Sequence, residues 1–170
     1  MKAVLISIKP KWCELIVRKE KTIEVRKTRP KIETPFKCYI YCTNPNTKNP
    51  NEVLEIHGTD GKIIRANGKV IGEFICDEIE CFAADYRMDT EQTERISELS
   101  CIKMSELMEY GYYSQCLFAW HISDLKIYDK PKALSEFTRL QETKFGMRPE
   151  EIKHPPQSWC YVESIQEVEE

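Results

Sequence analysis

The chain has 170 residues, of which 41% are hydrophobic and 31% are charged, and its net charge is -3 with an isoelectric point near 5.8. This length favours a single hydrophobic core, and the mild acidity argues against a uniformly basic nucleic-acid-binding protein. No apolar run reaches membrane-spanning length, and the first residues lead directly into a predicted strand instead of a secretory signal. We therefore expect a cytoplasmic protein with no membrane partner.

The eight cysteines do not indicate a disulfide framework or a metal site. A chain of this size without a secretory signal keeps its thiols reduced. No two cysteines have the C-x-x-C spacing of a structural zinc site, so we expect neither a metal nor another cofactor.

The charges are unevenly distributed along the chain. Residues 1–37 contain eleven Lys or Arg and four Glu, whereas residues 77–109 contain ten acidic residues and three basic ones. A positive segment is what attraction to nucleic-acid phosphates requires. The alternative interpretation is that these lysines and arginines form an ordinary solvated face.

The N-terminal segment predicts a strand, a short helix and a second strand. Residues 4–8 are apolar except for Ser7 and indicate a buried strand, Pro10 suits the first position of a helix, and Trp12, Leu15 and Ile16 follow at helical spacing. A lysine, a carboxylate and an arginine then fall within residues 21–26, where the helix gives way to the strand.

The remaining pattern is rich in strands. Asn67-Gly68 predicts a tight hairpin between the strands on either side of it. The acidic stretch from residue 85 to residue 99 is either a loop or a peripheral helix. The predicted elements in chain order are strands at 36–42, 62–65 and 69–76, a helix at 103–110, a strand at 117–128, a helical turn at 131–137 and a closing strand at 159–162.

The segment around residue 21 resembles the signature of the ASCH family, G-x-K-x-x-E-x-R, in the same strand-helix-strand setting. Lys21, Glu24 and Arg26 match the signature, while Lys19 occupies the position of its glycine, which favours a left-handed helix cap. The central hairpin and residues 118–122 and 155–162 extend the resemblance, which is to small bacterial and prophage members of the family.

The resemblance implies an α+β fold, namely a PUA-like small mixed β-barrel with a short helix between its first two strands and with peripheral helices. A single ASCH domain would span residues 1–165. It would carry a peripheral acidic insertion at about residues 85–112, and an acidic tail would follow at residues 166–170.

The leading functional hypothesis is a nucleic-acid-binding module that holds RNA, or a modified base or nucleotide, in a cleft lined by Lys21, Glu24 and Arg26. In an extended segment Thr22 shares a face with Glu24 and Arg26. The alternative for the last two is a simple surface ion pair. The further candidate ligand-binding residues are Thr22, Lys9 and Trp159.

An amidohydrolase is the alternative. Some small ASCH relatives hydrolyse N4-acetylcytidine with a lysine, a threonine and a glutamate, which correspond to Lys21, Glu24 and Glu73 here. Because Glu24 replaces the threonine, Glu24 or Thr22 would be the third member. Glu73 lies in an apolar strand, where a carboxylate is paired or has a raised pKa that suits a general acid or base. The alternative is that Glu73 projects to solvent. The second alternative is a protein-interaction domain.

Overall fold

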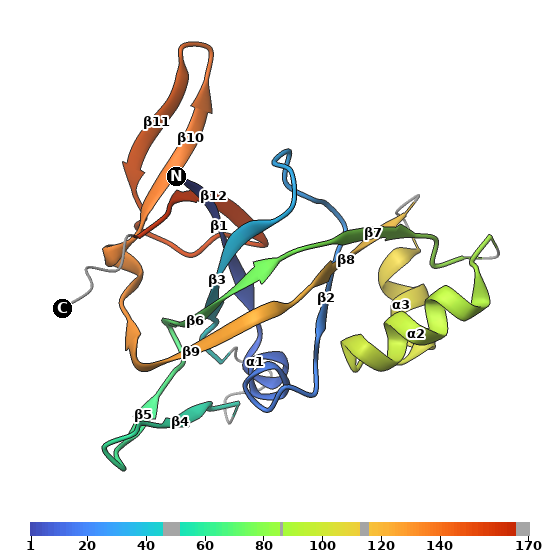
Figure 1. Ribbon diagram of the computed structural model, residues 1–170, viewed down its shortest axis with the longest axis horizontal. Coiled ribbons are helices and arrows are strands. Elements are labelled where there is room, and N and C mark those ends of the chain that lie inside the picture. Colours follow the sequence, from blue (N-terminus) through green and yellow to red (C-terminus); the bar gives the residue numbers. More distant parts are fainter. Residues whose placement is uncertain (46–51, 86, 113–115, 166–170) are drawn as a thin grey trace. The chain divides into compact units, whose positions relative to one another are not determined.

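The computed structural model describes residues 1–45, 52–85, 87–112 and 116–165 (Figure 1). The chain divides into two compact units. Unit 1 comprises Met1–Glu14, Lys37–Phe74 and Leu125–Glu170, and unit 2 comprises Leu15–Phe36 and Ile75–Asp124. The predicted acidic tail at residues 166–170 lies outside the described residues.

Strands dominate the described part of the chain. The elements in order are β1 (Lys2–Ile8), α1 (Pro10–Val17), β2 (Ile23–Arg26), β3 (Phe36–Cys42), β4 (Glu55–His57), β5 (Ile63–Arg65), β6 (Lys69–Cys76), β7 (Ile79–Phe82), α2 (Thr90–Ser100), α3 (Met104–Gly111), β8 (Leu117–His121), β9 (Ser123–Lys132), the 3-10 turn η1 (Leu134–Glu136), β10 (Thr138–Thr143), β11 (Gly146–Glu151) and β12 (Trp159–Glu163). None of these helices is long and apolar enough to cross a membrane.

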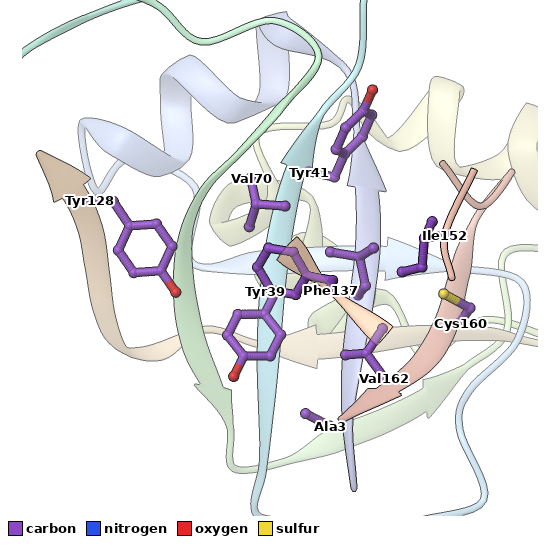
Figure 2. Packing of buried hydrophobic residues seen from close by; sticks show 10 residues of the cluster. Ala3, Tyr39, Tyr41, Val70, Tyr128, Phe137, Ile152, Cys160 and Val162 are labelled. Carbon is purple, nitrogen blue, oxygen red and sulfur yellow. The ribbon is translucent and has the colours of Figure 1, made fainter. Parts of the chain in front are cut away.

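Unit 1 is built on a seven-stranded mixed sheet with the strand order β11-β10-β12-β1-β3-β6-β9. β1 lies near its centre, antiparallel to β12 and parallel to β3, so that Leu5 is opposite both Cys160 and Tyr39. The two strands are apolar at almost every position because they are buried on both faces. Figure 2 shows the core on this sheet, in which the rings of Tyr39 and Phe137 meet edge to face at 5.0 Å.

Unit 2 is built on the antiparallel sheet β2-β8-β7, on which α2 and α3 pack. Asp89 caps the start of α2, because its side chain accepts a hydrogen bond from the backbone N–H of Gln92. Ile96 of α2 and Leu107 of α3 are fully buried against Ile23 and Ala119 of the sheet. The acidic stretch therefore forms helices whose apolar faces complete the core of this unit.

An α+β fold dominated by sheets is confirmed, but the predicted closed barrel is wrong. In the described residues the sheets are open, with β11 and β9 at the edges of one and β2 and β7 at the edges of the other. The chain does run from β1 through α1 to β2. However, β1 and β2 belong to different sheets, so α1 does not bridge two strands of one barrel.

The predicted hairpin at Asn67-Gly68 is also wrong. β5 pairs with β4, while β6 lies between β3 and β9 in the large sheet. The buried Asn67 side chain accepts a hydrogen bond from the N–H of Leu54 and donates to the carbonyls of Thr43 and Glu52. The hydrogen bonds of Asn67 join segments that are distant in the sequence. They outweigh the local preference of Asn67-Gly68 for a two-residue turn.

Candidate functional site

The signature begins where α1 ends. The N–H of Lys19 bonds the carbonyl of Ile16, and the N–H groups of Glu20 and Lys21 bond that of Leu15, so the last carbonyls of the helix are satisfied. Lys19 takes the left-handed conformation with φ of 60°. The backbone that the signature glycine favours is therefore present, although a lysine holds it at a steric cost.

Lys21 is directed into unit 2. Its side chain is fully buried, and its ammonium group donates to the carbonyl of Ser100, the last residue of α2, at 2.7 Å. The C-terminal carbonyls of a helix carry partial negative charge and lack partners within the helix, so a cation fits there. Next to it, the N–H of Thr22 bonds the carbonyl of Leu99 at 2.9 Å.

Glu24 joins the two cations of the signature. Its carboxylate lies 3.2 Å from Nζ of Lys21 and 2.9 Å from an Nη atom of Arg26, and the Glu24 and Arg26 side chains are only 8% and 11% exposed. Strict alternation would have separated Lys21 from the other two. It does not apply because Lys21 precedes β2, which begins at Ile23. We refer to Lys21, Glu24 and Arg26 as the buried triad.

Thr22 has a backbone role. Its N–H bonds α2 as described, its carbonyl accepts from the N–H of Ile122, and its side chain is half-buried. The residue thus ties the segment before β2 both to α2 and to the end of β8.

Tyr110 of α3 lies close enough to Arg26 and Glu24 for their charges to affect its phenol group. Burial raises the pKa of the Tyr110 phenol, the positive charge of Arg26 lowers it, and the negative charge of Glu24 raises it. The ammonium of Lys27 lies 4.8 Å from the centre of the Tyr110 ring, a cation–π contact.

A pocket follows the signature within unit 2. It holds about 610 Å³ and is lined by residues 29–34 and by Ile79 of β7. Pro30 is buried, and Ile32 and Ile79 are half-buried, whereas Arg29, Lys31, Glu33 and Thr34 are exposed. The pocket therefore has an apolar floor and a charged rim.

The surface of this segment is positive. Among residues 15–36, the exposed charged side chains are Arg18, Lys19, Lys27, Arg29 and Lys31 against Glu20 and Glu33. The triad adds one further positive charge beneath them, since it combines two cations with one carboxylate.

Glu73 lies in unit 1 and has its own partners there. One carboxylate oxygen is 2.7 Å from the ammonium of Lys37 on β3, and the other accepts a hydrogen bond from the Tyr128 hydroxyl of β9 at 2.5 Å. The Glu73 side chain is 13% exposed. The paired alternative therefore holds for Glu73, and the cation that pairs it is Lys37.

A search of solved structures finds the ASCH protein of Zymomonas mobilis with a TM-score of 0.57 and 17% identity, covering 95% of this chain and 87% of that one. A variant of that protein with one tyrosine changed to phenylalanine gives a TM-score of 0.58 at 17% identity, covering 96% of this chain and 91% of that one. A variant with one serine changed to alanine gives a TM-score of 0.58 at 16% identity, covering 95% of this chain and 88% of that one. The chain has the fold of an ASCH domain. No protein-family model and no curated protein matches its sequence.

The other two predicted ligand residues of this ASCH-like chain belong to unit 1. Lys9 is exposed, and its carbonyl accepts bonds from the N–H groups of Trp12 and Cys13 at the start of α1. Trp159 is half-buried and packs its ring at 5.4 Å from that of Tyr161. Lys21, Thr22, Glu24 and Arg26 belong to unit 2.

The structure adds a polar cluster that the sequence pattern did not reveal. Nε2 of His121 lies 2.6 Å from Glu80, whose other oxygen lies 2.5 Å from Arg95 of α2. Burial alone raises the pKa of Glu80, but hydrogen bonds from Arg95, His121 and Gln92 lower it to about 2. Glu80 and His121 lie 41 residues apart on paired strands, so local spacing could not have found them.

The cysteines and the acidic groups do not assemble a metal site in the described residues, where no group of three or more His, Cys, Asp or Glu side chains could hold an ion. All eight cysteines are free thiols, and five of them are buried.

Proposed function

We propose that this chain is an RNA-binding domain that holds a single strand on the positive surface of unit 2. The observation that carries the proposal is the group of exposed cations on residues 18–31, which flank in sequence a buried triad with a surplus positive charge. Phosphate contacts of this kind supply most of the sequence-independent affinity for nucleic acids.

In this proposal the buried triad positions the binding surface and does not touch the RNA. Lys21 is fully buried and bonded to α2, so it fixes the segment that carries Lys27, Arg29 and Lys31. A binding segment held by buried polar contacts loses less conformational entropy when a ligand arrives. The likeness to ASCH structures supports the proposal through the fold, and the sequence signature supports it independently.

Direct titration tests the proposal. Fluorescently labelled single-stranded RNA of about twelve nucleotides is titrated with the protein, and anisotropy is measured for mixed-sequence RNA, the same DNA sequence and duplex RNA. We expect the single-stranded RNA to bind most tightly, and the variant Arg29→Ala/Lys31→Ala to bind at least about tenfold more weakly. Binding to none of the three would overturn the proposal and favour a protein-interaction domain.

A hydrolase for N4-acylated cytidine is the second candidate, and Glu73 is the observation that favours it. Its half-buried carboxylate is oriented by a lysine and a tyrosine, and a carboxylate fixed in position can act as a general base. In that reaction Glu73 would take a proton from water as the water oxygen attacks the acyl carbon, and it would pass this proton to the N4 nitrogen as the C–N bond breaks, which would release acetate and cytidine.

The test of this second candidate is release of acetate from N4-acetylcytidine by the purified protein. A hydrolase would turn the substrate over, and Glu73→Gln would lower kcat about 100-fold or more. Lys37→Met and Tyr128→Phe show whether either partner contributes. Absence of turnover in the unmodified protein would remove this candidate.

A further inference from the structure

The pocket that follows the signature has the size of a small-molecule site. Its volume of about 610 Å³ lies within the 300–1,000 Å³ of typical ligand sites. Buried Pro30 and half-buried Ile32 and Ile79 offer flat apolar contact, and charged groups stand at the rim. An apolar floor with a few charged groups suits a ligand that is both planar and ionic.

The cations of the rim suit a phosphate. Arg29 and Lys31 both line the pocket, and the guanidinium of Arg29 lies 6.0 Å from the centre of the Phe118 ring. A guanidinium can bind a phosphate through two parallel hydrogen bonds. A phosphate there would be balanced by two positive charges.

The carboxylate of the rim selects among bases. Glu33 lines the same pocket and is exposed. A carboxylate only accepts hydrogen bonds, and its two oxygens suit two adjacent N–H donors. Of the four RNA bases, only guanine presents two such donors side by side on its Watson–Crick edge, namely the ring N1–H and the exocyclic amine.

We infer that the pocket lined by residues 29–34 and Ile79 binds one guanine nucleotide, with its phosphate at Arg29 and Lys31, its base on the apolar floor and its Watson–Crick edge at Glu33. The nucleotide can come from two sources. If it is a guanosine within a single strand, the inference rests on the proposed RNA binding. A free guanine nucleotide is the other source and carries the same chemistry.

Two titrations test the inference and distinguish the sources. The first measures calorimetric binding of GMP, AMP, CMP and UMP, and the second measures anisotropy with single strands that contain or lack one central guanosine. We expect GMP to bind at least about tenfold more tightly than the other nucleotides, which is the scale of discrimination by one paired hydrogen-bond contact. The same preference should appear for the strand with guanosine.

The variants separate the two ends of the ligand. Glu33→Gln replaces one acceptor oxygen with a donor, so it should abolish the preference for guanine while phosphate-dependent affinity remains. Arg29→Ala/Lys31→Ala should weaken all four nucleotides alike. The matched control is Glu150→Gln, a change of the same kind at an exposed residue of β11 in unit 1, and it should leave the preference unchanged.

The results distinguish failure of the pocket inference from failure of the proposed RNA binding. GMP binding that depends on Glu33, without RNA binding, supports the pocket with a free nucleotide and overturns RNA binding. RNA binding without a guanine preference, or with a preference that survives Glu33→Gln, overturns the pocket inference alone. Failure of both titrations overturns both proposals.

Discussion

The ammonium of Lys21 donates a hydrogen bond to the carbonyl of Ser100 at 2.7 Å, and it thereby ties the signature to the end of α2 across 79 residues of sequence. Three independent contacts join the same two segments, because Thr22 bonds Leu99 and the thiol of Cys101 bonds the carbonyl of Glu20. The most conspicuous basic residue of the sequence motif therefore has a structural role in this chain.

Replacing Lys21 should destabilise the protein strongly. Lys21→Met removes one of the two cations beside Glu24 and leaves the carbonyl of Ser100 without its donor, and an unsatisfied buried acceptor alone costs about 1–3 kcal/mol. Urea unfolding monitored by tryptophan fluorescence measures the loss. Lys62→Met is the control, since its side chain is 79% exposed and the change should cost less than about 0.5 kcal/mol.

The double variant Lys21→Met/Glu24→Gln checks the reason for that loss. It should be less stable than Lys21→Met alone, because Glu24 still pairs with Arg26 in the single variant, whereas the double variant takes this carboxylate away from the nearly buried guanidinium. A loss below about 1 kcal/mol for Lys21→Met alone would contradict the structural role of the triad.

Lys19→Gly should stabilise the chain by about 1 kcal/mol. Lys19 has φ of 60°, a conformation that costs a residue with a Cβ atom roughly 1–2 kcal/mol and costs glycine little. The midpoint of urea unfolding would rise. Arg18→Gly is the control, because the neighbouring residue does not share the positive φ and should lose stability on the same change. A fall in the midpoint for Lys19→Gly would show that its side chain matters more than its backbone.

Glu80 should make the stability depend on acid pH. Its pKa in the folded protein is about 2, below the ordinary value of 4.5, so an unfolded chain takes up this proton more readily than the folded one. The contribution is fully present above about pH 4.5 and is lost as the pH falls toward 2. Melting temperatures between pH 7 and pH 2.5 should fall less steeply for Glu80→Gln than for the unmodified protein, and parallel curves would disprove the assignment.

Local sequence patterns predicted the strand at residues 36–42 and a helix near residues 103–110. Residues 36–42 form a strand as expected, and the helix predicted at 103–110 is α3 at Met104–Gly111. The strand is buried at almost every position, whereas in α3 Leu107 is buried and Met108 and Tyr110 are exposed. The strand predicted at 117–128 is divided into β8 and β9. Ile122 lies between them, and Asp124, the second residue of β9, has a positive φ of 47°.

The remainder depends on contacts that no local pattern contains. β11 is exposed along its whole length, so it has no apolar alternation by which to recognise it. Glu73 stood out as a carboxylate in an apolar strand, but its partners Lys37 and Tyr128 are 36 and 55 residues away. The residues of the signature could be identified from the sequence. The burial of Lys21 could not be predicted, because it depends on the position of α2.

The dependence of RNA affinity on salt tests the central claim most directly. Neutralised phosphates release counterions, so the logarithm of the affinity falls linearly with the logarithm of salt concentration, by about 0.7 for each phosphate contact of a single strand. We predict that Arg29→Ala/Lys31→Ala reduces this slope by about 1.4, while Lys62→Ala/Lys144→Ala, an equal loss of charge in unit 1, leaves it unchanged. Equal slopes for the unmodified protein and both variants would contradict RNA binding on the positive surface of unit 2.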